Sequence, residues 1–432
     1  MNRPRSQRLW PLAVPLLCLA SMLAIVPAIC AQLVRTPTPA STIPHTYFGM
    51  HIHGMVTPRP GNTRPAGWPT VPFGSWRLLA AYVDWPQLEP ARGQWNFAAL
   101  DRYLQLAEQH HVEVLLPLVL SPAWASSRPN EKSSYSPGNA APPANLDDWQ
   151  TYVRTVATRY KGRISDYEIW NEPSVRTFFS GTPDEMVALT REASRILKEV
   201  DPRNVVVSPS AAEGGTSWLD QFLAAGGGKY VDVIGYHFYV RHDPEAMVPV
   251  IEQVRRIMEK HGVGNLPLWN TETGWRIANH RSEVKPYESG SPVLADDEAS
   301  AYVARAYVVA WASGISRFYW YAWDNGVMGL TEADGATVKP PAKAYGEIEN
   351  WLVGARMKLC DRYSGLWNCR LERDGGYTGN IIWMSGTSKP FELLPAWNMS
   401  QERDLEGRTR NIAGAKTVQI GPEPILIENR AP

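Results

Sequence analysis

The sequence predicts an α/β fold in which short strands and longer helices alternate, followed by a smaller β-rich region. Three observations predict it. Eight short apolar segments recur between residues 47 and 323, with helix-like periodic segments between them. Two of these segments end on a glutamate beside aromatic and polar residues, at Glu172 and Glu272. After about residue 354 the helical patterns stop, and short strands alternate with glycine, proline and asparagine.

The eight apolar segments are the strands of a predicted parallel sheet, because strands that alternate with helices pair in parallel. They cover residues 47–53, 75–81, 112–120, 165–172, 205–209, 231–239, 267–273 and 316–323. The clearest helices cover residues 101–111, 147–160, 183–200, 244–261 and 296–313. Pro183 and Pro244 each follow a residue that favours a helix start, Thr182 and Asp243.

Eight such units predict a (β/α)8 TIM barrel over residues 46–353. An open doubly wound sheet would carry a glycine-rich phosphate turn after its first strand, and the turn here, which begins Gly54-Met55-Val56, is not one. Residues 354–432 are predicted to form a small β-sandwich-like accessory domain, with strands at 380–384, 391–395, 417–420 and 424–427. We expect this region to pack on the barrel; a sugar site of its own is the open alternative.

The overall composition is that of an ordinary globular protein. The chain has 432 residues, of which 44% are hydrophobic and 20% charged, enough for one large and one small domain. Lys+Arg and Asp+Glu both number 43, so the formal net charge is zero. This balance does not favour a nucleic acid or an anionic membrane surface as a partner.

The first 31 residues resemble a secretory signal peptide. Arg3, Arg5 and Arg8 precede a mostly apolar stretch at residues 9–29, and small residues follow at Ala28 and Ala31. An uncleaved anchor and a lipoprotein acylated at Cys30 are the alternatives, but prolines within the apolar stretch disfavour a stable membrane span. We therefore expect an exported protein, secreted or periplasmic, with no stable membrane span in its mature form. Residues 32–45 are predicted to be an extended linker.

Two cysteines remain beyond this leader, Cys360 and Cys369. An oxidising compartment would favour a disulfide between them, and nothing in the sequence indicates a catalytic thiol.

The two strand-ending glutamates carry the functional prediction. A carboxylate at the end of an apolar strand is costly unless it has a partner or a function. Barrel active sites form at the carboxyl ends of the strands, and Glu172 and Glu272 end the fourth and seventh strands. Two converging carboxylates are what cleavage of a glycosidic bond requires. Glu168, deeper in the fourth strand, is interpreted as a buried partner for a basic side chain.

The segment Trp170-Asn171-Glu172-Pro173 on the fourth strand, together with Glu272 on the seventh, resembles the clan A retaining glycoside hydrolases. Residues 76–97 are most similar to family 39 of that clan, with family 5 as a neighbour. The resemblance covers roughly residues 47–352. It implies a two-glutamate double-displacement mechanism on a β-linked polysaccharide or oligosaccharide, with no cofactor.

The resemblance also implies roles for individual residues. Glu172 would be the general acid/base and Glu272 the nucleophile. Asn171 would bind the sugar 2-hydroxyl, Arg77 would hold Glu272 ionised, and Tyr239 would donate to it with His237 nearby. Trp323 would form the floor of the sugar subsite, with Trp320 as the alternative.

Two further positions are predicted to contact substrate. Some clan members carry a histidine at the end of the third strand, where this sequence has Trp124. His51 and His53 end the first strand, and His53 is the predicted contact. A metal site is not predicted, because zinc would need a third protein ligand. Trp85, Trp275 and Tyr321 are equally consistent with sugar platforms and with packing.

The sequence therefore predicts a glycosidase that binds a carbohydrate, and we expect a monomer. Two alternatives stay open: a transglycosylase on the same scaffold and a non-catalytic carbohydrate-binding barrel.

Overall fold

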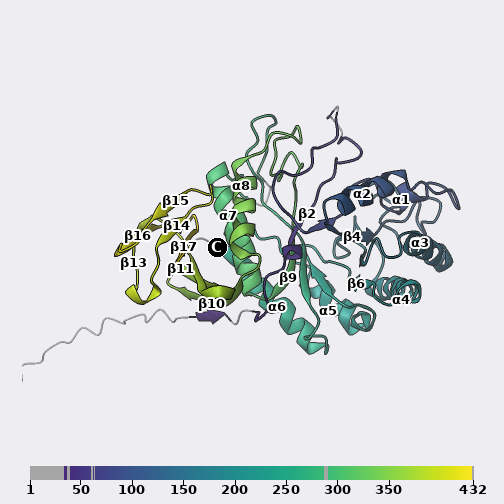
Figure 1. Ribbon diagram of the computed structural model, residues 1–432. Helices are drawn as coiled ribbons and strands as arrows, with labels where there is room; N and C mark the ends of the chain where they lie inside the picture. Colours follow the sequence, from purple (N-terminus) through teal and green to yellow (C-terminus); the bar gives the residue numbers. More distant parts are fainter. Residues whose placement is uncertain (1–33, 37–38, 60–61, 63, 287–289, 431–432) are drawn as a thin grey trace, which may run out of the picture. The chain divides into compact units, whose positions relative to one another are not determined.

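Eight parallel strands form the central sheet of the protein (Figure 1). A computed structural model describes residues 34–36, 39–59, 62, 64–286 and 290–430. The predicted leader therefore lies outside the described residues. The strands are β2 (Phe48–Met50), β3 (Ser75–Arg77), β4 (Glu113–Leu118), β5 (Asp166–Ile169), β6 (Val205–Val207), β7 (Ile234–Tyr236), β8 (Leu268–Thr273) and β9 (Ile315–Trp320). Each lies within or largely overlaps one predicted segment.

The sheet closes into a barrel. Its hydrogen-bonded order is β6-β5-β4-β3-β2-β9-β8-β7. Single parallel bridges from Val207 to Val233 and from Ala211 to Tyr236 join β6 to β7 and complete the ring. The predicted TIM barrel is confirmed, with the carboxyl ends of all eight strands at one mouth.

Helices cover the outside of the barrel. They are α1 (Trp85–Leu88), α2 (Ala98–Gln109), α3 (Leu146–Arg159), α4 (Pro183–Val200), α5 (Thr216–Ala224), α6 (Met247–Lys260), α7 (Asp296–Ala312) and α8 (Pro340–Leu352). Short 3-10 helices are η1 (His45–Tyr47), η2 (Gly227–Tyr230), η3 (Pro244–Ala246), η4 (Asp374–Gly376) and η5 (Pro395–Trp397). The start of α4 is set by a capping box, in which the Thr182 side chain accepts from the Glu185 backbone N–H and the Glu185 side chain accepts from the Thr182 backbone N–H.

Side chains inside the barrel form layers. Tyr167 and Ile169 of β5 belong to the core beneath the helices. Asp166 and Glu168 alternate with them and therefore face the barrel interior. Asp166 lies against Arg317 in a lower layer, with 3.1 Å between Oδ2 and Nη1. Glu168 lies one step nearer the mouth and pairs with Arg77, as the sequence predicts.

The C-terminal region is β-rich, as predicted. Its strands are β10 (Arg356–Tyr363), β11 (Leu366–Arg373), β12 (Tyr377–Met384), β13 (Lys389–Glu392), β14 (Gln401–Arg403), β15 (Thr409–Asn411), β16 (Thr417–Ile420) and β17 (Ile425–Glu428). A seven-stranded antiparallel sheet has the order β1-β10-β11-β12-β17-β14-β15, and β13 pairs with β16. The structure differs from the predicted linker here, because β1 (Val34–Thr36) is a strand of this sheet.

The C-terminal sheet and the barrel share one apolar core. Trp367 and Trp383 stack with 5.4 Å between their ring centroids and belong to the same cluster as Trp351 of α8. In Figure 1, α7 and α8 run beside these strands. The region therefore packs on the barrel, as we expected.

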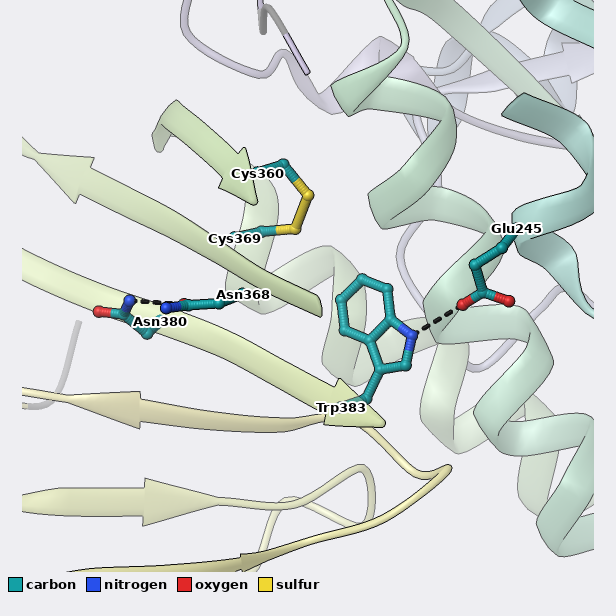
Figure 2. The surroundings of a disulfide bond; sticks show 6 residues. All are labelled: Glu245, Cys360, Asn368, Cys369, Asn380 and Trp383. Carbon is teal, nitrogen blue, oxygen red and sulfur yellow. Dashed lines mark hydrogen bonds between the residues drawn. A yellow bond between two sulfur atoms is a disulfide. The ribbon is translucent and has the colours of Figure 1, made fainter. Parts of the chain in front are cut away.

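Cys360 and Cys369 face each other across β10 and β11 and form a disulfide. Figure 2 shows it near a hydrogen bond of 2.7 Å from Trp383 Nε1 to Glu245 Oε1, which joins β12 to η3. Within the described part of the chain, no helix combines the length and hydropathy that crossing a membrane requires.

Candidate active site

Glu172 and Glu272 meet at the mouth of the barrel. A carboxylate oxygen of each lies within 4.8 Å of the other. Glu272 belongs to β8, whereas Glu172 follows β5. Trp170 and Glu172 have positive φ angles of 66° and 46°, which are costly for non-glycine residues and end the extended strand. The Glu172 backbone N–H donates to Ser210 O over 2.9 Å and fixes this turn.

Both oxygens of Glu272 accept hydrogen bonds, one from a buried donor and one from a half-buried donor. The Tyr239 hydroxyl donates to Oε1 over 2.8 Å. Arg77 Nη1 donates to Oε2 over 2.9 Å. Arg77 comes from β3 and Tyr239 from just beyond β7, so two other parts of the barrel hold this carboxylate of β8.

Arg77 also binds two residues of the β5 segment. Its Nη2 donates to Asn171 Oδ1 over 2.9 Å, and its Nε donates to Glu168 Oε2 over 2.5 Å. Arg77 and Glu168 are both fully buried. The guanidinium therefore ties the Asn171-Glu172 turn to Glu272.

Glu172 has different surroundings. Its Oε1 lies 3.0 Å from His237 Nδ1, which is 4.0 Å from Glu272 Oε1. Burial raises the pKa of the Glu172 carboxyl to about 7, although the charge of Arg77 lowers it in part. Burial lowers the pKa of His237 to about 4, against the charge of Glu272. Near pH 7 Glu172 thus exchanges a proton easily, beside a neutral imidazole.

Glu172, His237 and Glu272 are also the residues with which this site could hold a metal ion, because one ligand atom from each lies within 4.8 Å of the others. However, Arg77 and Tyr239 already donate to both oxygens of Glu272, and the positive charge of Arg77 opposes a cation. The arrangement suits an acid–base pair better than a metal.

A cavity of about 460 Å³ opens from the two glutamates. Phe178, Trp275, Tyr321 and Met328 give it apolar walls, and the Arg241–Glu213 ion pair lies at its edge. Such walls suit the C–H faces of sugar rings. Of the aromatics whose role the sequence left open, Trp275 and Tyr321 line the cavity, whereas Trp85 is fully buried and stacks on Tyr152.

The remaining predicted contacts lie around this centre. His53 is buried, and Arg59 Nη1 lies 3.1 Å from its Nδ1. Trp124 is half-buried and donates through Nε1 to Glu89 O over 2.9 Å. Trp323 is 2% exposed. The residues lining the cavity do not include these three, so their contact with substrate stays a prediction.

Sequence reasoning missed Tyr135, Phe178 and Met328. Tyr135 is half-buried at Asn171, with 3.5 Å between Tyr135 OH and Asn171 Nδ2, and its ring contacts Phe178. The aromatic pair Phe178-Phe179, a few residues after the Asn-Glu-Pro turn, was the available signal. Tyr135 and Met328 lie in loops without a regular pattern.

The chain resembles known proteins in both sequence and fold. The model of the family described as "Glycosyl hydrolases family 39" matches residues 86–309, a little more than half of the chain. A β-xylosidase of Caldicellulosiruptor saccharolyticus is 30% identical over 112 residues, 24% of this chain and 22% of that protein. Endo-1,4-beta-xylanase 2 of Claviceps purpurea is 32% identical over 88 residues, 19% of this chain and 24% of the relative. The chain thus spans under a quarter of the length of these curated relatives.

Solved structures show the same fold. A family 39 glycoside hydrolase from Bacteroides cellulosilyticus WH2 superposes with a TM-score of 0.67 at 18% identity, over 82% of this chain and 75% of the other. A family 39 β-xylosidase from Caulobacter crescentus superposes with a TM-score of 0.63 at 18% identity, over 90% and 97% of the two chains. The family match includes both glutamates and the turn that carries Asn171, and on this evidence the chain belongs to glycosyl hydrolase family 39.

Proposed function

We propose that the protein is a retaining glycoside hydrolase that cleaves β-linked oligosaccharides or polysaccharides. The observation that carries the proposal is the approach of Glu172 and Glu272 to within 4.8 Å, in different electrostatic surroundings. Retaining glycosidases place their carboxyl groups about 5–5.5 Å apart, and inverting enzymes leave a wider gap for water. One protonated and one ionised carboxyl group are what such a pair needs.

In the first step Glu272 is the nucleophile. One of its oxygens attacks the anomeric carbon, and the bond from that carbon to the leaving oxygen breaks. Glu172 transfers its proton to the leaving oxygen. Arg77 and Tyr239 hold the Glu272 carboxylate in line, and Asn171 is placed to hydrogen-bond the sugar hydroxyl next to the reacting carbon.

In the second step a water molecule replaces the leaving group. Glu172, now a carboxylate, removes a proton from this water as its oxygen attacks the anomeric carbon. The bond between the sugar and Glu272 breaks, and both carboxyl groups return to their starting state. A pKa of about 7 for Glu172 suits both the donation and the removal of this proton.

Two relatives with similar sequences indicate which β-glycosides to test first. They are a β-xylosidase and an endo-1,4-β-xylanase. We therefore propose β-xylosides and xylan oligosaccharides as the first substrates to test, followed by other β-glycans and bacterial exopolysaccharides. We further propose that the enzyme acts as a monomer after export, with contributions to sugar binding from His53, Trp124 and Trp323.

The test uses purified protein and two glutamate variants on aryl β-xylosides and xylo-oligosaccharides. Glu272→Ala should abolish turnover, and added azide should restore part of it as a glycosyl azide. Glu172→Gln should lose activity on xylo-oligosaccharides, whose leaving group needs a proton, and keep much of the first step on an activated aryl glycoside.

NMR of the first product should show a retained anomeric configuration, and product sizing separates hydrolysis from transfer to an added sugar acceptor. Full activity of Glu172→Gln on xylo-oligosaccharides would overturn the assignment. Sugar binding by calorimetry without turnover over days would identify a binding barrel instead.

A further inference from the structure

One fully buried carboxylate at the site has no role in the two chemical steps. Glu168 lies on β5, four residues before Glu172, and faces the barrel interior. Its Oε2 accepts the Nε hydrogen bond of Arg77 over 2.5 Å, and its Oε1 accepts one from Ser210 Oγ over 2.5 Å. Thr271, the residue before Glu272, donates from Oγ1 to Ser210 Oγ over 2.7 Å. Both carboxylate oxygens of Glu168 therefore have a hydrogen-bond partner.

The geometry of Arg77 makes Glu168 more than a packing partner. A guanidinium is a rigid planar fork, so fixing one nitrogen fixes the direction of the other two. In Arg77 the Nε is held by Glu168, and the two terminal nitrogens reach Glu272 and Asn171, each over 2.9 Å. Loss of the Glu168 contact would free the fork to turn toward the mouth.

We propose that Glu168 is a positioning residue that holds Arg77 by its Nε and shares its positive charge with Glu272. The proposal deepens the proposed function and rests on it. The negative charge of Glu168 partly cancels the effect of the Arg77 charge at Glu272 and Glu172, because the Coulomb energies of separate charge pairs add. Glu168 thereby sets both the direction and the strength of the field at the two catalytic glutamates.

The other ionisable groups facing this centre come from every side of the barrel. They are His51 after β2, Asp84 after β3, Glu172 after β5, His237 and Tyr239 after β7, Glu272 in β8, Tyr321 after β9 and the Tyr135 hydroxyl. Burial lowers the pKa of His51 well below its ordinary value, with Arg77 and His53 adding to the effect, so His51 is neutral near pH 7. Arg77 is therefore the dominant positive charge at the centre.

The test compares Glu168→Gln and Glu168→Asp with Asp166→Asn. Asp166 is the matched control because it faces the same interior two residues earlier and pairs with Arg317, away from the catalytic glutamates. Glu168→Gln removes the negative charge that shares Arg77, so the pKa of Glu172 should fall. The alkaline limb of kcat/KM should move to lower pH by about one unit.

Glu168→Asp keeps the charge but is one methylene shorter. We expect the wild-type alkaline limb with kcat about 10²-fold lower, because a small displacement of a catalytic group costs about that much. Asp166→Asn should keep the wild-type limb and most of the activity. If Glu168→Gln does not fold, Glu168→Asp still tests the positioning role of Glu168. A wild-type kcat in Glu168→Asp would overturn the proposal.

A measurement without turnover separates this inference from the proposed function. The titration of Glu172 can be followed by NMR in protein labelled with 13C at the glutamate carboxyl carbons, and its signal is identified by its loss in Glu172→Gln. The midpoint should fall in Glu168→Gln and stay in Asp166→Asn. If the wild type cleaves no glycoside, the hydrolase proposal fails while this titration still decides the role of Glu168. An unchanged midpoint in Glu168→Gln would leave Glu168 a purely structural residue.

Discussion

Tyr239 is the neutral donor to Glu272, and its hydroxyl is a sharp test of how that carboxylate is held. A hydrogen bond to a charged group contributes about 1.5–3 kcal/mol, so Tyr239→Phe should lower kcat by about 10- to 100-fold. Steady-state kinetics on an aryl β-xyloside would measure the loss. Tyr167→Phe is the matched control, because the Tyr167 hydroxyl has no hydrogen-bond partner among the described residues. Equal kcat in the two variants would contradict the role of Tyr239.

Asp84 makes the stability of the fold depend on pH. Burial raises the pKa of Asp84 to about 7, and Arg77 lowers it only in part, whereas in the unfolded chain it ionises near 3.8. Between these values the folded state binds more protons than the unfolded state, so this group's contribution to stability falls as pH rises. Asp84→Asn should therefore raise the free energy of unfolding by up to about 4 kcal/mol at pH 8 and by little near pH 4.

Urea unfolding at pH 4.5 and pH 8 would measure the effect of Asp84→Asn. The increase in the free energy of unfolding caused by Asp84→Asn should be larger at pH 8 than at pH 4.5. A gain of the same size at both would mean that the carboxylate is already ionised across this range.

For single residues, the sequence predicts the position of a side chain best where that side chain stands at the end of a strand. Arg77 and Glu272 meet as expected, because the carboxyl ends of parallel strands share one mouth. Asn171 was expected to bind a sugar hydroxyl, and in the structure its Oδ1 accepts a hydrogen bond from Arg77 Nη2. Side chains in loops are different. The indole of Trp124 turns to Glu89 and under the guanidinium of Arg92, and no periodic pattern encodes such a turn.

The β10–β11 hairpin is the element that the disulfide crosslinks. Cys360 and Cys369 are nine residues apart, and in the chain-entropy view a link over so short a loop contributes roughly 2.5 kcal/mol. Removing it in a Cys360→Ser, Cys369→Ser double variant should lower the stability of the protein by about that amount and leave kcat unchanged. Guanidinium unfolding measures the loss, and thiol titration of the untreated mature protein should detect neither cysteine. Two free thiols, or an unchanged midpoint, would contradict the expectation.

Most elements with a clear apolar pattern were predicted, whereas α1, α8 and β11 were not. All eight barrel strands lie within or largely overlap the predicted segments, and α4 begins and ends at the predicted residues. α1 has only four residues, too few to show a helical period. α8 is mostly buried, and its polar stripe is limited to Lys343, Glu347 and Asn350. β11 was missed even though Trp367, Cys369 and Leu371 alternate with Asn368, Arg370 and Glu372, which is the pattern of a half-buried strand.

The barrel and the C-terminal sheet are held together by Trp383 as well as by their shared core. Its indole donates to Glu245 Oε1 over 2.7 Å, and Arg305 Nε donates to the same oxygen over 2.8 Å. Trp383→Phe should lower the free energy of unfolding by about 2 kcal/mol, because a half-buried hydrogen bond to a charged group is lost. Chemical unfolding of the whole chain would measure it.

Trp351→Phe controls for the change in ring size in the same core. The Trp351 indole nitrogen has no hydrogen-bond partner among the described residues. A smaller loss in Trp383→Phe than in Trp351→Phe would show that the Glu245 bond contributes nothing to stability.

The pairing of β1 with β10 has a consequence for the order in which the chain can fold. A ribosome releases residues 34–36 long before residues 356–363, so the first strand has no partner for most of synthesis. Contacts between distant parts of a chain form late and slow the search for the native state. β1 therefore stays unpaired until β10 has been synthesised, and the seven-stranded sheet is completed only after β17 has also emerged.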